Sequence, residues 1–130
     1  MRYDPMVAPD PEAWLNCDEE ERLQAVLRYH ERARIQLPKA TVHAAAHVTI
    51  ENQVAMGDET PVAGKLQELM REGLDRHDVI HAVGTVFSEF LWESMRGDLD
   101  AVEDPNALYE ERVRALTAQK WLDEYGDVDG

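Results

Sequence analysis

Two pairs of histidines in this sequence share one spacing. His43 and His47 stand four residues apart in the stretch HAAAHVTIENQ, and His77 and His81 repeat that spacing in RHDVIH. On an α-helix, residues four apart lie on one face about a turn from each other, so each pair can chelate an ion. Neutral imidazole binds Zn, Fe, Ni and Cu. The two pairs therefore predict a site for one transition-metal ion or for two neighbouring ions.

Two carboxylates accompany the histidine pairs. Glu51 stands one turn beyond His47 and is a candidate terminal or bridging ligand, which would move the metal preference toward Zn, Fe or Mn. Asp78 lies within the second pair, where it resembles the zinc-protease helix signature with Asp in place of Glu; a capping role at a helix start is the competing interpretation. If a metal activates water for hydrolysis, Glu51 or Asp78 is the candidate catalytic base.

One histidine and one glycine extend the candidate site. His30 stands alone on the apolar face of an earlier helical segment, where it is either a further ligand or a structural histidine. Gly84 lies one turn after His81 on the same helical stripe, and the missing side chain leaves space near the proposed ion.

A function without metal is the rival interpretation. Each histidine pair can hydrogen-bond internally, with Thr49 and Glu51 as partners, and so form a polar core. The chain would then be a non-catalytic structural or interaction module whose acidic surface meets a protein partner, or a pH sensor in which several buried histidines become charged together.

The elements that must position these residues have helical patterns throughout. Residues 1–17 carry three of the six prolines and are expected to form an extended arm. Asp18, Asp75 and Asp104 each have the sequence context of a helix N-cap. Five helical segments are predicted, at about 18–37, 38–56, 61–74, 75–97 and 104–125.

No segment shows strand alternation bounded by turns, so the fold class is predicted to be all-α. We expect an up-and-down bundle of four to five helices over residues 18–125 as one domain, followed by a tail at 126–130. Short loops make neighbouring helices alternate in direction, which brings the histidines of the second and fourth helices, and also His30, to one depth in the bundle.

Composition excludes several classes of protein. The net charge of −14 argues against nucleic-acid binding, which depends on Lys and Arg. Cys17 is the single cysteine, so neither an internal disulfide nor a thiolate cluster can form. The sequence lacks a membrane-spanning apolar run and a signal peptide, and we expect a cytoplasmic protein. Exposed aromatic side chains would mark a homodimer face or a protein partner's surface.

The chain resembles a family of small bacterial proteins known only as a conserved domain of unknown function. The resemblance rests on HAAAHVTIENQVA followed by GLDRHDVIHAVGTVFSE, and with PDPEAWL and RYHERA it extends over most of residues 9–97. It implies that His43, His47, Glu51, His77 and His81 are family positions, and it implies no activity. Hemerythrin-like bundles fit less well, because the last predicted helix contains no histidine.

Overall fold

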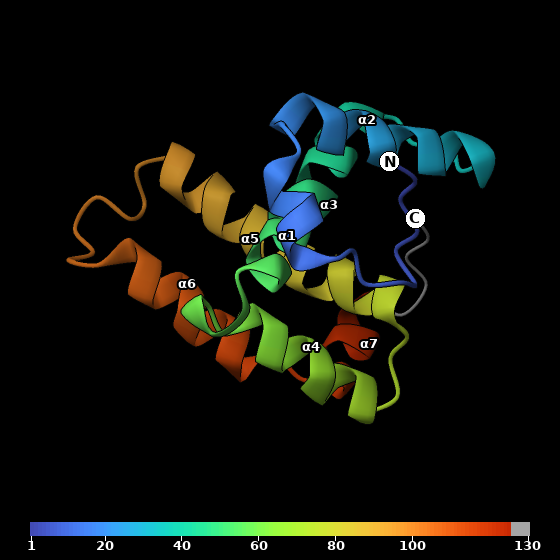
Figure 1. Cartoon of the computed structure of the whole chain (residues 1–130). Coiled ribbons are helices and arrows are strands. Elements are labelled where there is room, and N and C mark those ends of the chain that lie inside the picture. The colour runs from blue at the N-terminus through green and yellow to red at the C-terminus, as the bar shows by residue number, and fades with distance from the viewer. Residues whose placement is uncertain (126–130) are drawn as a thin grey trace.

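The computed structural model describes residues 1–125, and every regular element in that range is helical (Figure 1). The predicted all-α bundle is therefore confirmed, whereas the predicted tail at 126–130 lies outside the described residues. Within residues 1–125, no helix combines the length and the apolar character needed to cross a bilayer. The elements are α1 (Pro11–Asn16), α2 (Glu19–Arg32), α3 (Ala40–Ala55), the 3-10 turn η1 (Gly57–Glu59), α4 (Val62–Arg71), α5 (Arg76–Met95), α6 (Pro105–Ala115) and α7 (Ala118–Tyr125).

Helices α3 and α5 occupy the middle of the molecule, with α1 and α2 on one side and α4, α6 and α7 on the other (Figure 1). The buried apolar side chains form two clusters. One joins the N-terminal segment to α2 and α3 through Tyr3, Trp14, Val26 and Val48. The other joins α3 to the four helices from α4 to α7. The five histidines come from α2, α3 and α5. Of these helices, α2 belongs to the first cluster, α5 to the second and α3 to both.

The predicted helix starts at Asp18 and Asp75 are confirmed as N-caps. The Asp18 carboxylate accepts a hydrogen bond from the Glu21 backbone N–H at 2.8 Å, and Asp75 accepts one from the Asp78 N–H at 2.7 Å. Each bond satisfies a backbone donor that has no partner within its helix. The cap at Asp75 places His77 in the first turn of α5.

Helix α2 ends at Arg32, five residues before the predicted end at Leu37. The chain turns at Arg34, whose φ of 58° is left-handed. The Ile35 N–H then donates to the His30 carbonyl at 3.0 Å, the long bond of a Schellman motif. The apolar periodicity runs on to Leu37 and therefore predicted a longer helix. The sequence does not signal the earlier end, because the left-handed position is occupied by arginine and not by glycine, the residue usually found there. The motif fixes His30 in the last turn of α2.

The prediction of an extended arm over residues 1–17 is wrong for its second half, because Pro11–Asn16 is helix α1. Asp10 caps this helix by accepting from the Ala13 N–H at 3.0 Å, and proline at the first helical position has the φ that a helix needs. The segment is also anchored: Tyr3 and Trp14 are each 1% exposed.

The predicted fifth helix, 104–125, is two helices in the structure. Leu116 is extended, with ψ of 135°, and separates α6 from α7. The buried amine of Lys65 in α4 donates to the carbonyls of Arg114 and Leu116 at 2.7 and 3.0 Å. The cation satisfies carbonyl acceptors that have no partner at the end of a helix, and so it stabilises the break. Because Lys65 comes from another helix, the local sequence pattern does not reveal this stabilisation.

Candidate metal centre

Five histidines from three helices meet in one cluster. His30 comes from α2, His43 and His47 from α3, and His77 and His81 from α5. The centroids of neighbouring imidazole rings lie 4.3 to 5.2 Å apart. The predicted convergence of the two pairs, together with His30, at one depth is confirmed.

His47 is the centre of this cluster and is 1% exposed. Its Nε2 lies 3.0 Å from Nε2 of His43 and 3.2 Å from Nε2 of His81. The ring nitrogens form two overlapping groups, and the nitrogens of each group lie within 4.8 Å of one another. One group joins His30, His43 and His47, and the other joins His47, His77 and His81. Every candidate histidine therefore belongs to a group that includes His47.

These separations fit the coordination of one ion. Zinc–imidazole bonds of about 2.0–2.1 Å place two ligand nitrogens about 3.4 Å apart in tetrahedral geometry and about 3.0 Å apart at a right angle. The distances from His47 Nε2 to His43 and His81 are 3.0 and 3.2 Å, so these pairs already have the spacing of metal ligands. Pairs near the 4.8 Å limit would need small ring rotations to join them.

The other ring nitrogen of His47 is held by the N-terminal segment. Nδ1 lies 3.3 Å from the Tyr3 hydroxyl, and that hydroxyl donates its hydrogen to Oε2 of Glu51 at 2.6 Å. Because a tyrosine has one hydroxyl hydrogen, the Nδ1–H of His47 must donate to the Tyr3 oxygen. This tautomer leaves the lone pair on Nε2, the nitrogen that faces His43 and His81.

Glu51 is held in turn by a buried arginine. Arg76 donates to both Glu51 oxygens at 2.7 Å and to the carbonyl of Pro5 at 2.9 Å. Burial alone would lower the pKa of Arg76, but its hydrogen bonds and charge interaction with Glu51 raise it. Burial, followed by the Glu51 charge, raises the pKa of Tyr3 well above its usual value. Tyr3 therefore stays protonated and Arg76 stays charged.

Glu51 is connected to the histidine cluster by the Tyr3 hydroxyl and is not itself one of the grouped candidate ligands. Among the described residues, Glu51 belongs to neither group of nitrogens that could share an ion. Both of its oxygens accept hydrogen bonds from other side chains, Oε1 from Arg76 and Oε2 from Arg76 and Tyr3. A carboxylate that is held in this way can orient a ligand histidine.

His30 has its tautomer fixed by the backbone. Its Nδ1 lies 2.9 Å from the carbonyl oxygen of Val26, one turn earlier in α2. Since a carbonyl only accepts, Nδ1 carries the hydrogen and Nε2 carries the lone pair. This arrangement is the usual one for a metal-ligating histidine, and it also satisfies a buried structural one.

The cluster keeps His47 uncharged at neutral pH. Burial lowers the pKa of His47 most, and the nearby imidazoles of His43, His81, His77 and His30 lower it further. A histidine must be neutral to bind a metal ion, so the electrostatic environment prepares His47 as a ligand.

Asp78 lies at the start of α5 and outside the two nitrogen groups of the described residues. Its backbone N–H donates to the Asp75 side chain, and burial, followed by the Asp75 charge, raises the pKa of its carboxyl group. A negative side chain in the first helical turn interacts favourably with the positive end of the helix dipole. This geometry favours the capping interpretation of Asp78.

Sequence reasoning missed Tyr3 and Arg76. Arg76 carried a signal, because it stands four and seven residues before Ile80 and Val83, on the buried face of α5. A charged residue on an apolar stripe needs a buried partner. Tyr3 carried none, since it lies 44 residues from His47 in a segment without periodicity.

No family model, curated protein or solved structure matches the chain. The resemblance to a small bacterial family stays a prediction. The candidate centre is therefore argued from its own geometry.

Proposed function

We propose that this chain binds a transition-metal ion, Zn, Fe or Ni, at the junction of α2, α3 and α5. His47 is the central ligand. The other ligands come from the remaining histidines of the cluster, which are His30, His43, His77 and His81. The observation that carries the proposal is that His47 belongs to two groups of ligand nitrogens that lie within 4.8 Å of one another, one with His30 and His43 and one with His77 and His81.

The tautomer of His47 supports a metal more than a hydrogen-bonded core. Its Nε2 has one lone pair and faces two ring nitrogens at hydrogen-bonding distance. A single lone pair accepts one well-aligned hydrogen bond, so a second N–H directed at it gains little. An ion bound to His47 and to the two other histidines of either group would use all three lone pairs, which supports the metal interpretation.

Glu51 and Asp78 take indirect roles in this proposal. Glu51 positions His47 through Tyr3 and is balanced by Arg76, and Asp78 stabilises the start of α5. Three histidine ligands with the fourth position left to water are one of the known forms of catalytic zinc site. A metal held there supplies a Lewis acid that makes a coordinated water more acidic, so hydrolysis is the reaction class that we propose.

Metal content tests the proposal. The chain is produced without a histidine tag, dialysed against metal-free buffer and analysed for its elements. We expect close to one equivalent of Zn, Fe or Ni in the unmodified protein and a large loss in His47→Ala. The matched control is Val83→Ala, a buried position of α5 in the apolar cluster that should destabilise folding without lowering metal content.

The rival interpretation predicts a different result. If the histidines form a hydrogen-bonded core in a non-catalytic module, the purified chain carries no stoichiometric metal and takes none up when Zn, Fe or Ni is added. That result would refute the proposed function.

A further inference from the structure

A cavity of about 260 Å³ opens onto one side of the histidine cluster. His43, His47 and His81 line it, whereas His30 and His77 do not. Each group of candidate ligand nitrogens, His30 with His43 and His47 or His47 with His77 and His81, therefore has two of its three histidines on the cavity wall, and an ion held there would face the cavity. The volume is near the lower end of the range of ligand pockets, about 300–1,000 Å³, so it suits a small molecule.

Gly84 keeps this cavity open. It lies within α5, one turn after His81, and lines the cavity. A Cβ atom at this position would meet Ile50 Cγ1 at 4.0 Å, an ordinary contact, so close helix packing does not require the glycine. Glycine inside a helix costs about 1 kcal/mol relative to alanine. The effect of the glycine at this position is therefore to leave space in the cavity.

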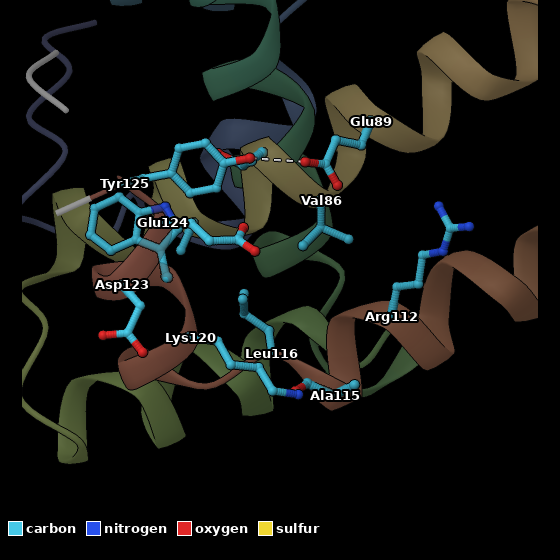
Figure 2. Close-up of a pocket in the computed structure, with 12 residues that line it drawn as sticks. Val86, Glu89, Arg112, Ala115, Leu116, Lys120, Asp123, Glu124 and Tyr125 are labelled. Carbon is cyan, nitrogen blue, oxygen red and sulfur yellow. Dashed lines mark hydrogen bonds between the residues drawn. The ribbon is translucent and has the colours of Figure 1, made fainter. Parts of the chain in front are cut away.

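The charge around the cavity is negative. Glu89 lines it, and no lysine or arginine of residues 1–125 does. The Tyr125 hydroxyl of α7 donates to Glu89 Oε1 of α5 at 2.9 Å, at a wall shared with a second cavity (Figure 2). Two further charged groups interact with this pair. The Arg112 guanidinium interacts electrostatically with Glu89 but donates its hydrogen bond to Glu93, and Glu124 interacts electrostatically with Tyr125.

Glu89 and the histidine cluster share this cavity. Glu89 follows His81 by eight residues, which is about 12 Å along a helix, and both residues line the cavity. A ligand that coordinates the ion can therefore extend through the cavity toward the Glu89 carboxylate.

We propose that the cavity binds a small molecule with a metal-coordinating nitrogen or oxygen at one end and a protonated amine at the other, the amine paired with Glu89. The inference rests on the proposed metal site and names the class of ligand for it. Glu89 is solvent-exposed, so screening limits the gain from a charge-assisted hydrogen bond to about tenfold in affinity.

Two probes test this pairing. Histamine carries an imidazole and an ammonium group, and 4-methylimidazole carries the imidazole alone. The protein is first loaded with cobalt(II), its metal content is measured, and each probe is titrated while the visible spectrum of the metal is recorded. We expect histamine to bind about tenfold more tightly than 4-methylimidazole at pH 7. The preference should be lost in Glu89→Gln.

Two variants serve as controls. Tyr125→Phe keeps the Glu89 charge and should keep the preference for histamine. Gly84→Leu should fill the cavity, so that neither probe binds while the metal content stays unchanged. Equal binding of the two probes, a preference that survives in Glu89→Gln, or binding of neither probe to the loaded protein would overturn the inference. Failure to load metal would instead refute the proposed function, and this inference with it.

Discussion

The two ring nitrogens of His47 have different partners. Nδ1 donates to Tyr3, and Nε2 faces His43 and His81. Because an imidazole rotates about two side-chain bonds, a contact at Nδ1 orients the ring and also selects which nitrogen holds the lone pair. At the proposed metal site, Tyr3 and Glu51 would therefore act as positioning residues for His47 without contacting the ion.

Tyr3→Phe tests this role at the scale of one hydroxyl group. The variant keeps the buried ring but removes both hydrogen bonds, so His47 loses its orientation. We expect metal affinity to fall about 10- to 100-fold, as for other changes to groups that orient metal ligands. Competition with a chromophoric chelator measures the affinity.

The control for this variant is Tyr29→Phe. Tyr29 also packs against histidines of the cluster, with ring centroids 5.1 Å from His30 and 5.8 Å from His77. Its ring is preserved in the variant, and metal affinity should change less than threefold. Equal losses in the two variants would show that the Tyr3 hydroxyl has no special role.

The lowered pKa of His47 predicts an acid sensitivity of the metal-free protein. In the unfolded chain, His47 takes up a proton below about pH 6.5, whereas in the folded chain it stays neutral. Acid therefore stabilises the unfolded state. Between pH 7 and pH 5.5, this residue should remove about 1 kcal/mol from the free energy of unfolding.

Urea unfolding of the chelator-treated protein at the two pH values measures this change. Other groups titrate in the same range, so the informative quantity is the difference between the unmodified chain and His47→Gln. Identical pH dependence in the two proteins would contradict the neutral state of buried His47.

At the scale of elements, α3 connects most of the molecule through three consecutive polar residues. Successive helical residues point about 100° apart, so Glu51, Asn52 and Gln53 face three different neighbours. Glu51 binds α5 and the N-terminal segment, Asn52 Oδ1 accepts from Trp14 Nε1 of α1 at 2.8 Å, and Gln53 Oε1 accepts from the Tyr109 hydroxyl of α6 at 2.7 Å. The helix that carries His43 and His47 is thereby tied to α1, α5, α6 and the N-terminal segment.

The ion pair between Glu51 and Arg76 predicts a non-additive pair of substitutions. Both side chains are almost fully buried, with 1% and 4% exposed. Removing one partner leaves a buried charge, so Glu51→Leu and Arg76→Met should each cost about 3–5 kcal/mol in the free energy of unfolding. The double variant should recover much of that loss, because it buries no charge.

Chemical unfolding of the four proteins in this double-mutant cycle measures the coupling. The double variant should fold yet bind metal more weakly, because Tyr3 has lost its acceptor. Additive losses in the cycle would contradict the account of a strongly coupled buried pair.

The sequence predicted the parts of the centre that depend on local pattern. The four-residue spacing placed each histidine pair on one helical face, and the cap at Asp75 defined where α5 begins. The contacts of Tyr3 and Arg76 were not predictable, because they join segments far apart in the chain. The end of α2 at Arg32 was missed because the left-handed residue that follows it, Arg34, is not glycine. The break at Leu116 was missed because Lys65 stabilises it from another helix.

At the scale of the whole molecule, the histidine cluster lies where the two apolar clusters meet at α3. Enclosed polar groups need partners, and five histidines with the Glu51 and Arg76 pair form a large polar assembly for a chain of 130 residues. The net charge of −14 also attracts cations to the molecule. Both features favour a bound metal ion as a stabilising part of the fold.

X-ray absorption spectroscopy at the metal edge of the untagged, metal-loaded chain tests the central claim most directly, because it reports the atoms bound to the ion. The account predicts nitrogen ligands at about 2.0–2.1 Å with the scattering pattern of at least three imidazoles. A coordination sphere dominated by carboxylate or water oxygens, without imidazole scattering, would contradict it.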